Sequence, residues 1–233
     1  ESFPAYLPSR LAGFYERAGF VDTLCDKEGS VTVIGAVSPQ GGDFSEPVTQ
    51  NTQRFVRCFW ALDRSLAYAR HFPSINWTTS YTEYYNDLLP WYRKNFGEDF
   101  PELRERIIAL LNEESSLMEI VKLIGSDILP DDQKLVIETA KVIREGFLQQ
   151  NAFHEHDTYM VPANQMAMLR VILHLYDGAR TLVGSGIPLR LLSETGIFSV
   201  LERMKFGLGE GKKPEEFEKQ VDDALDKVRR ANA

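Results

Sequence analysis

Few stretches of this 233-residue chain combine residue types and spacing that could perform chemistry, and residues 154–157 are the densest of them. His154, Glu155, His156 and Asp157 offer two imidazoles and two carboxylates. A zinc site gathers three or four such ligands from a rigid frame, and no cysteine or histidine elsewhere in the sequence has a matching spacing. We therefore interpret this stretch as a solvated loop and predict no metal site.

A second stretch, Gly207–Lys213, imitates the glycine-rich loop that binds the phosphates of a nucleotide. That loop requires a glycine five positions before Gly211 and a serine or threonine directly after the lysine. The chain has Phe206 and Lys213 at these positions, and no buried strand precedes them. The stretch is interpreted as a linker, and we expect no catalytic residue of nucleotide hydrolysis in this chain.

The two cysteines, Cys25 in a polar stretch and Cys58 in an apolar one, are too few for a disulfide framework in a chain of this length. Both are expected to be free thiols. Because Cys58 has no adjacent histidine or aspartate that would make it a nucleophile, we predict that it packs in the core.

Composition limits the class of function further. Hydrophobic residues make up 43% of the chain, enough for a sizeable core, and the net charge of −8 with a pI near 5.1 disfavours a nucleic-acid partner. No apolar run approaches the roughly 20 residues that span a bilayer, and no signal segment opens the sequence. We expect a soluble, cytoplasmic protein.

The elements that must position any site fall into two parts. Residues 1–81 predict an α/β segment in which helices and short β-rich runs alternate. The expected helices are 8–18, 48–55 and 64–70, and the expected strands are 31–37, 56–62 and 75–80. The run 56–62 is short enough to be a helix end instead, although a strand is favoured.

The strand over residues 31–37 is the most distinctive of these elements. Val31, Val33, Ile34 and Val37 form an uncharged β-branched run, which is typical of a strand covered on both faces in a parallel sheet. A loop rich in glycine and proline follows it and carries two acidic residues. We predict a buried strand that feeds a shaped loop.

From Thr82 onward the pattern is helical only, and we place a domain boundary there. Apolar residues recur at helical spacing, which predicts a bundle of about five to seven helices over residues 82–233. The predicted buried stripes are Leu103, Ile107, Leu110, Leu111, Met118, Val121 and Ile124; Leu135, Thr139, Val142 and Ile143; Met168, Ile172, Leu175, Tyr176, Ala179 and Leu182; and Phe217, Val221, Leu225 and Val228.

Four segments resemble the catalytic A subunit of the V-type and A-type rotary ATPases, in order along almost the whole chain. They are Tyr6–Arg10, Gly29–Val48, Arg70–Trp77 and Leu148–Phe153. The resemblance implies the C-terminal part of a RecA-like parallel-sheet nucleotide-binding domain over residues 1–81, followed by an all-α helical bundle over residues 82–233. It also implies that the phosphate loop lies upstream of Glu1 in such a protein. We therefore expect the chain to be a C-terminal fragment that is inactive alone.

The same resemblance implies a function, cofactors and partners. The intact protein would hydrolyse or make ATP with Mg²⁺ and couple this to proton or sodium transport. It would alternate with the B subunit in a hexameric ring, contact the central stalk, and lie peripherally on the cytoplasmic face of the membrane. ATP or ADP is not expected to be bound to the fragment.

The resemblance assigns an adenine-binding role to two aromatic residues, Phe72 and Phe153. Two exposed rings can hold a purine between them by stacking, which needs no hydrogen-bond code. The alternative is that both phenylalanines are core residues. The complete set implied for adenine binding is Phe72, Pro73, Gln150, Asn151, Ala152 and Phe153.

Two loops are implied to contact the central stalk. The first lies between two helices and comprises Asp127, Ile128, Leu129, Pro130, Asp131 and Asp132. If it contacts the stalk, Ile128 and Leu129 should be exposed, whereas a purely structural turn should bury them and use its acids to stabilise the next helix. The second loop contains Gly42 and Asp43, and its alternative interpretation is a solvated turn.

A different class of function remains open from the sequence. The chain could be a non-catalytic helical module that docks onto a partner protein in a larger assembly. Within the resembled family, the B subunit is the nearest alternative, but residues 72–77 follow the form of the A subunit.

Overall fold

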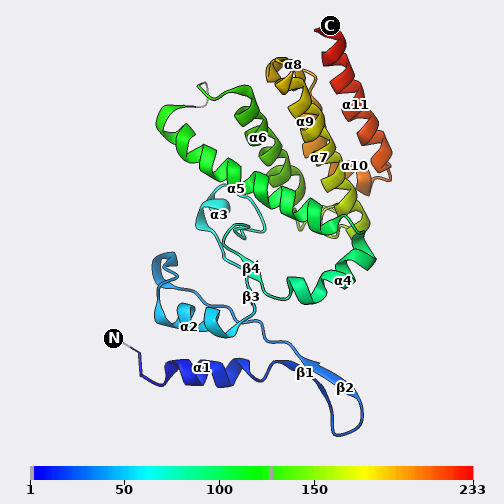
Figure 1. Cartoon of the computed structure of the whole chain (residues 1–233). Helices are drawn as coiled ribbons and strands as arrows, with labels where there is room; N and C mark the ends of the chain where they lie inside the picture. Colours follow the sequence, from blue (N-terminus) through cyan, green and yellow to red (C-terminus); the bar gives the residue numbers. More distant parts are fainter. Residues whose placement is uncertain (1–2, 126–127, 233) are drawn as a thin grey trace. The chain divides into compact units, whose positions relative to one another are not determined.

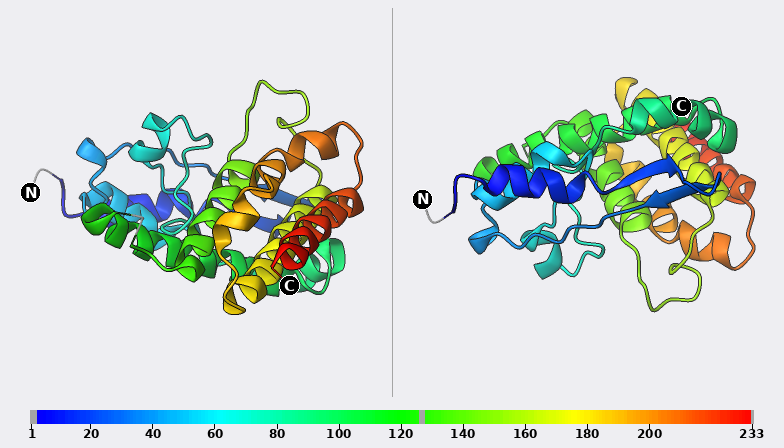
Figure 2. Two further views of the ribbon diagram at one scale, coloured as in Figure 1. Left: turned by 90° about the horizontal axis from the view of Figure 1, so that it is seen from above. Right: turned by 90° about the horizontal axis from the view of Figure 1, so that it is seen from below.

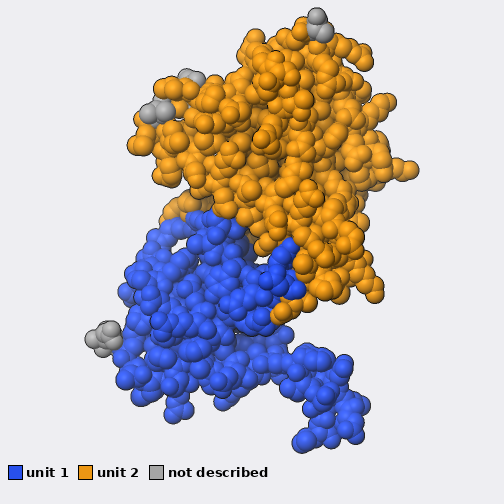
Figure 3. Space-filling view, in the orientation of Figure 1, with its two compact units in different colours: residues 1–64, 75–86 blue, residues 65–74, 87–233 orange. Residues whose placement is uncertain are grey.

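The computed structural model describes residues 3–125 and 128–232 and divides the chain into two compact units. Unit 1 comprises residues 1–64 and 75–86, and unit 2 comprises residues 65–74 and 87–233 (Figure 3). The predicted domain boundary after residue 81 stays a prediction.

Unit 1 begins with a helix and a β-hairpin. Helix α1 (Leu7–Tyr15) has a proline in its first turn, where the missing N–H costs nothing. Strand β1 (Gly19–Asp22) then pairs antiparallel with β2 (Glu28–Val31), with Gly19 opposite Val31. The expected helix 8–18 is thus confirmed, although it is shorter at its C-terminus.

The prediction of a buried strand over residues 31–37 is wrong. Only Val31 belongs to a strand, Ile34 is exposed, and Val33 and Val37 are half-buried. A strand inside a parallel sheet needs hydrogen-bonding neighbours on both sides. Within residues 3–125 and 128–232, however, the sheets are the two antiparallel pairs β1–β2 and β3–β4, so this segment has no parallel neighbour.

Of the next elements, the expected helix 48–55 is confirmed, and the expected strand 56–62 is much shorter. Helix α2 (Pro47–Phe55) is capped by Glu46, whose carboxylate accepts hydrogen bonds from the backbone N–H groups of Val48 and Thr49 at 3.0 and 2.9 Å. The short 3-10 turn η1 (Gln40–Gly42) precedes it. Strand β3 (Cys58–Phe59) pairs antiparallel with β4 (Tyr81–Thr82), so the expected strand 56–62 is reduced to two residues.

The expected strand over residues 75–80 is wrong, and so is the core position of Cys58. Asn76 Oδ1 accepts hydrogen bonds from the backbone N–H groups of Thr78 and Thr79, both at 3.0 Å, which closes a turn instead of a strand. Cys58 lies in the two-residue strand β3 with its side chain exposed. Successive side chains of a strand point to opposite faces, and in β3 it is Phe59 that is half-buried.

Unit 2 is helical. Helix α3 (Arg64–Tyr68) ends before the expected position 70, because Arg70 adopts a left-handed backbone with φ of 57°. The elements that follow are α4 (Tyr85–Phe96), α5 (Phe100–Ile124), α6 (Asp131–Val142), the π-helical turn η2 (Ile143–Leu148), α7 (Pro162–Gly184), α8 (Leu189–Ser193), α9 (Ile197–Glu202), α10 (Met204–Gly209) and α11 (Pro214–Ala231). Helix α7 packs against α6 and α11 (Figures 1 and 2).

The predicted apolar stripes form the core of this unit. On α11, Phe217, Val221, Leu225 and Val228 are all buried. On α7 the predicted residues are buried except Tyr176, and on α5 the stripe is buried at its N-terminal half, from Leu103 to Leu111. The bundle predicted from helical spacing is therefore confirmed, although residues 82–125 and 128–232 form eight α-helices, more than the expected five to seven. No helix within the described ranges has the length and apolar character needed to cross a membrane.

The interpretation of Gly207–Lys213 as a linker is wrong for the first two of its three glycines. Gly207 and Gly209 belong to α10, and Gly207 is buried. A Cβ atom on Gly207 would lie 2.8 Å from Cζ of Phe217, and one on Gly209 would overlap Cβ of His156. These glycines therefore allow close packing of α10 against its neighbours.

Candidate functional site

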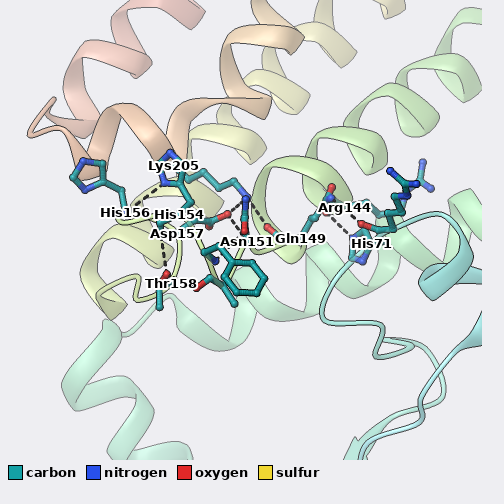
Figure 4. Close-up of polar contacts among 12 residues, drawn as sticks. His71, Arg144, Gln149, Asn151, His154, His156, Asp157, Thr158 and Lys205 are labelled. Carbon is teal, nitrogen blue, oxygen red and sulfur yellow. Dashed lines mark hydrogen bonds and ion pairs between the residues drawn. The ribbon is translucent and has the colours of Figure 1, made fainter.

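The structure brings together the two segments expected to bind adenine. The backbone N–H of Gln150 donates a hydrogen bond to the carbonyl of Phe72 at 2.7 Å, and Gln149 Nε2 donates to the carbonyl of Arg70 at 3.4 Å. The neighbouring His71 is buried, and its Nε2 donates to the carbonyl of Arg144 at 3.0 Å (Figure 4). The segment 70–73 is therefore fixed beside the segment that leaves η2.

The loop that carries Phe153 is hydrogen-bonded within itself. Asn151 Oδ1 accepts from the backbone N–H of Phe153 at 3.0 Å, and the hydroxyl of Thr158 donates to the carbonyls of Ala152 and His154 at 2.9 and 2.7 Å. Such side-chain to backbone bonds define a loop without a helix or strand ladder. The backbone under the ring of Phe153 is thus well specified.

All six predicted adenine-binding residues are exposed. The side chain of Phe153 is 100% exposed and that of Phe72 is 52% exposed. Pro73, Gln150, Asn151 and Ala152 are exposed as well. The alternative in which both phenylalanines are core residues is therefore wrong, and both rings are accessible for stacking.

The interpretation of residues 154–157 as a solvated loop is wrong for Asp157. This side chain is buried and lies 2.8 Å from Nζ of Lys205, which is buried too. Asp157 Oδ2 also accepts a hydrogen bond from the backbone N–H of Asn151 at 2.7 Å. Lys205 was not predicted from the sequence, and its only signal there is a lysine flanked by the apolar residues Met204 and Phe206.

A second ion pair, between Glu114 and Arg144, lies at the π-helical turn η2. Glu114 of α5 is buried, and Arg144 of η2 approaches it to 3.2 Å. Burial raises the pKa of the Glu114 carboxyl, and the positive charge of Arg144 opposes this rise. The pair connects α5 to the π-helical turn from which residues 149–153 emerge. Turns of this kind recur at functional sites.

The two apolar residues of the predicted stalk-contact loop differ in solvent exposure. Asp127 lies outside the described residues. Ile128 is 69% exposed, as expected of a contact surface, whereas Leu129 is only 6% exposed, as expected of a structural turn. Pro130 is exposed and precedes α6.

The two aspartates that begin α6 differ in environment. Asp131 Oδ2 accepts a hydrogen bond from the backbone N–H of Leu189 at 2.8 Å, so its carboxylate serves the start of α8. Asp132 is exposed in the first turn of α6, where its charge favours the helix dipole. Asp131 therefore has a structural role, and Asp132 is the more accessible of the two acids.

The second predicted loop, with Gly42 and Asp43, is an exposed turn in unit 1. Gly42 has a φ of 80°, which favours glycine. The carboxylate of Asp43 accepts a hydrogen bond from the backbone N–H of Ser45 at 2.9 Å, and the hydrogen bonds from Ser45 lower the pKa of Asp43. The geometry fits a solvated turn and equally a loop offered to a partner.

Two family models match the chain in succession. Residues 1–82 match the nucleotide-binding domain of the ATP synthase alpha/beta family, and residues 89–190 match the C-terminal domain of V and A type ATP synthase. The predicted fold class is thereby confirmed as part of a nucleotide-binding domain followed by a helical C-terminal domain. The resemblance seen in the sequence is confirmed as well.

Curated relatives are similar over most of this chain. The V-type ATP synthase alpha chain of Halothermothrix orenii is 56% identical over 212 residues, which are 91% of this chain and 36% of that protein. The A subunit of the A-type ATP synthase of Methanopyrus kandleri is 50% identical over 232 residues, which are 98% of this chain and 39% of that protein. The chain therefore spans less than two fifths of the length of these relatives.

Solved structures share the fold, and the ATP synthase subunit NeqB from Nanoarcheaum equitans is an example, with a TM-score of 0.61 over 75% of this chain and 40% of that chain. Its sequence identity of 20% limits this likeness to the fold alone.

Proposed function

Because this chain belongs to the family of A subunits of V-type and A-type ATP synthases and matches their C-terminal portion, we propose that it supplies the adenine side of the nucleotide site in such a protein. Phe72 and Phe153 stack on the base, and Pro73 and residues 150–152 form the surface beside it. The phosphates and Mg²⁺ bind elsewhere in the intact protein, since this sequence has no phosphate loop.

The observation that carries the proposal is the complete exposure of Phe153 in a hydrogen-bonded loop. A fully exposed phenylalanine side chain gains nothing from burial in the fold. The hydrogen bonds of Asn151 and Thr158 nevertheless fix the backbone on both sides of it. A planar base that stacks on the ring would cover its apolar face.

The role of the whole protein follows from the same family. It hydrolyses or synthesises ATP with Mg²⁺ and couples this reaction to proton or sodium transport, as one of the copies that alternate with B subunits around a central stalk. It lies on the cytoplasmic face of the membrane through the assembled complex. This chain alone has no ATPase activity, because it lacks the backbone amides and lysine of a phosphate loop.

The helical unit also contacts the central stalk in this proposal. Ile128 offers an exposed apolar side chain at the turn before α6, and Asp132 adds an exposed charge in the first turn of that helix. Leu129 anchors the turn in the bundle, so the contact surface is smaller than the whole loop. Gly42 and Asp43 offer a second exposed turn for the same partner.

The test of the adenine role replaces Phe153 with alanine in the full-length protein. The Kd for ATP should rise by an amount equivalent to about 1–3 kcal/mol, the value of one base stacked on an aromatic ring, while Tm stays unchanged. Isothermal titration with ATP measures the affinity.

Tyr159→Ala is the matched control, because Tyr159 is an accessible aromatic residue of the same loop region and has no proposed contact with the base. It should leave the Kd unchanged. An unchanged Kd in Phe153→Ala would contradict the adenine role and would favour the alternative, a non-catalytic helical module that docks onto a partner.

A further inference from the structure

Lys205 places an ammonium group inside the helical unit. Of the lysines and arginines in residues 3–125 and 128–232, it alone is buried. Its partner Asp157 is buried as well, with 2.8 Å between Nζ and Oδ2. Both charges leave water when this pair forms, and well-packed apolar side chains at such positions are often as stable or more stable. Stabilisation of the fold alone therefore does not explain why a buried ion pair stands at these two positions.

The ammonium group joins the two ends of the loop that carries Phe153. At one end it donates a hydrogen bond to the carbonyl of Gln149 at 2.5 Å, and at the other it pairs with Asp157. Asp157 in turn accepts from the backbone N–H of Asn151. Figure 4 shows Lys205 reaching from its helix to Gln149 and Asp157. A single side chain thus closes the base of the loop.

Helix α10 supports the same loop at two further points. The ring of Phe206, next to Lys205, lies against the ring of His154 with 4.6 Å between the centroids. Gly209, one turn further, leaves space for the side chain of His156. The loop therefore also contacts α10 through the rings of His154 and Phe206 and through the side chain of His156 beside Gly209.

We propose that Lys205 and Asp157 are positioning residues for adenine binding, whose ion pair holds the loop 149–157 so that the ring of Phe153 is in place before the nucleotide arrives. The proposal rests on the proposed role of Phe153. Ordering a loop in advance removes an entropic cost that binding would otherwise have to meet. Without the pair, the ring is still present but no longer held, so the affinity for the base falls and the affinity for the phosphates does not.

The experiment compares two ligands in the full-length protein, ATP and inorganic tripolyphosphate, which lacks the base. The main variant combines Lys205→Met with Asp157→Asn. It removes both charges together, so that neither is left buried and unpaired, and the asparagine keeps an oxygen that can accept from the N–H of Asn151. Lys205→Met alone is the second variant, and Tm of each protein is measured.

In the double variant, the Kd for ATP should rise by about fivefold to a hundredfold, up to the loss of one complete base stack, and the Kd for tripolyphosphate should stay unchanged. Adding Phe153→Ala to the double variant should then have little further effect, because both changes remove the same contact. Lys141→Met removes a more accessible lysine, which pairs with Glu202 at 3.0 Å, and should change neither Kd.

Three results would overturn the proposal. An equal loss of affinity for ATP and tripolyphosphate would show a general structural role. An unchanged ATP affinity in the double variant, with a loss in Phe153→Ala, would remove the positioning role and leave the adenine role intact. No loss in Phe153→Ala itself would remove the adenine role, and the positioning role with it.

Discussion

At the scale of single residues, Asp99 and Arg170 show how an ion pair fixes the frame of the helical unit. Arg170 of α7 donates from Nε to Asp99 Oδ2 at 2.7 Å and from a terminal nitrogen to Asp99 Oδ1 at 2.8 Å. Asp99 precedes α5, so this bidentate ion pair links the start of α5 to α7. The hydrogen bonds from Arg170 lower the pKa of the Asp99 carboxyl.

This lowered pKa predicts a pH-dependent contribution to stability. Because the folded pKa lies below the unfolded value of about 3.9, the ion pair should stabilise the fold above that pH and lose its effect as the pH falls through the folded pKa. Asp99→Asn should therefore reduce the free energy of unfolding at pH 7 by less than about 1 kcal/mol, since both side chains are partly exposed. The difference from the parent protein should be smaller at pH 2 than at pH 7. Urea unfolding at both pH values measures it.

Glu119→Gln is the matched control for this measurement. Glu119 pairs with Lys122 within α5, and both side chains are largely exposed. Its substitution should change stability little at either pH. A loss in Asp99→Asn that persisted undiminished at pH 2 would rule out the ionised carboxylate as its source.

The residues of the candidate site were predictable to different degrees. Phe72 and Phe153 were identified through a family resemblance, because a lone phenylalanine carries no signal of stacking. Lys205 was not identified, since its partners Gln149 and Asp157 are distant in the sequence and only the fold brings them together. Asp157 was wrongly expected in solvent for the same reason.

At the scale of elements, the helices followed from the spacing of apolar residues, while the strands did not. A helix satisfies its backbone hydrogen bonds within itself, so the stripe on α11 was sufficient to predict it. A strand depends on neighbours elsewhere in the chain, and residues 32–37 lack them in the described structure. The linker predicted at Gly207 failed differently, because glycine also permits close helix packing.

The packing of α7 against α11 gives a prediction at this scale. A Cβ atom on Gly178 of α7 would overlap Cδ1 of Leu225, a buried residue of α11. Gly178→Ala should therefore destabilise the protein, because overpacking costs about 1–3 kcal/mol and the gain in helix propensity is at most about 1 kcal/mol. Thermal unfolding followed by circular dichroism should show a lower Tm.

Gly184 on the same helix is the control position. A Cβ atom there would have no neighbour within 4 Å, so Gly184→Ala should leave Tm unchanged or raise it slightly. If Gly178→Ala were equally harmless, Leu225 would have to move without a cost in stability. The close contact between α7 and α11 would then not require a glycine at position 178.

At the scale of the whole molecule, one continuous helical segment in unit 2 connects the proposed stalk-contact turn with the loop proposed to bind adenine. Helix α6 begins directly after the turn that contains Ile128, and it runs into η2, from which the loop of Phe153 emerges. One face of this segment is buried, and it comprises Leu135, Val136, Thr139, Ala140, Val142 and Ile143. A displacement at one end can therefore be transmitted to the other through a packed and rigid element.

The contact proposed for the central stalk predicts different effects for two neighbouring residues. Ile128→Ser in the assembled complex should reduce the number of ions transported per ATP hydrolysed, because Ile128 is the exposed apolar side chain of the turn, and should leave Tm and the Kd for ATP unchanged. Leu129→Ala should instead lower stability by about 2–5 kcal/mol, because its side chain is buried in the bundle. Ion transport and ATP hydrolysis measured together in vesicles give the ratio. If Ile128→Ser left this ratio at the parent value, the turn would be a structural connection between α5 and α6 and would have no part in the transmission of force.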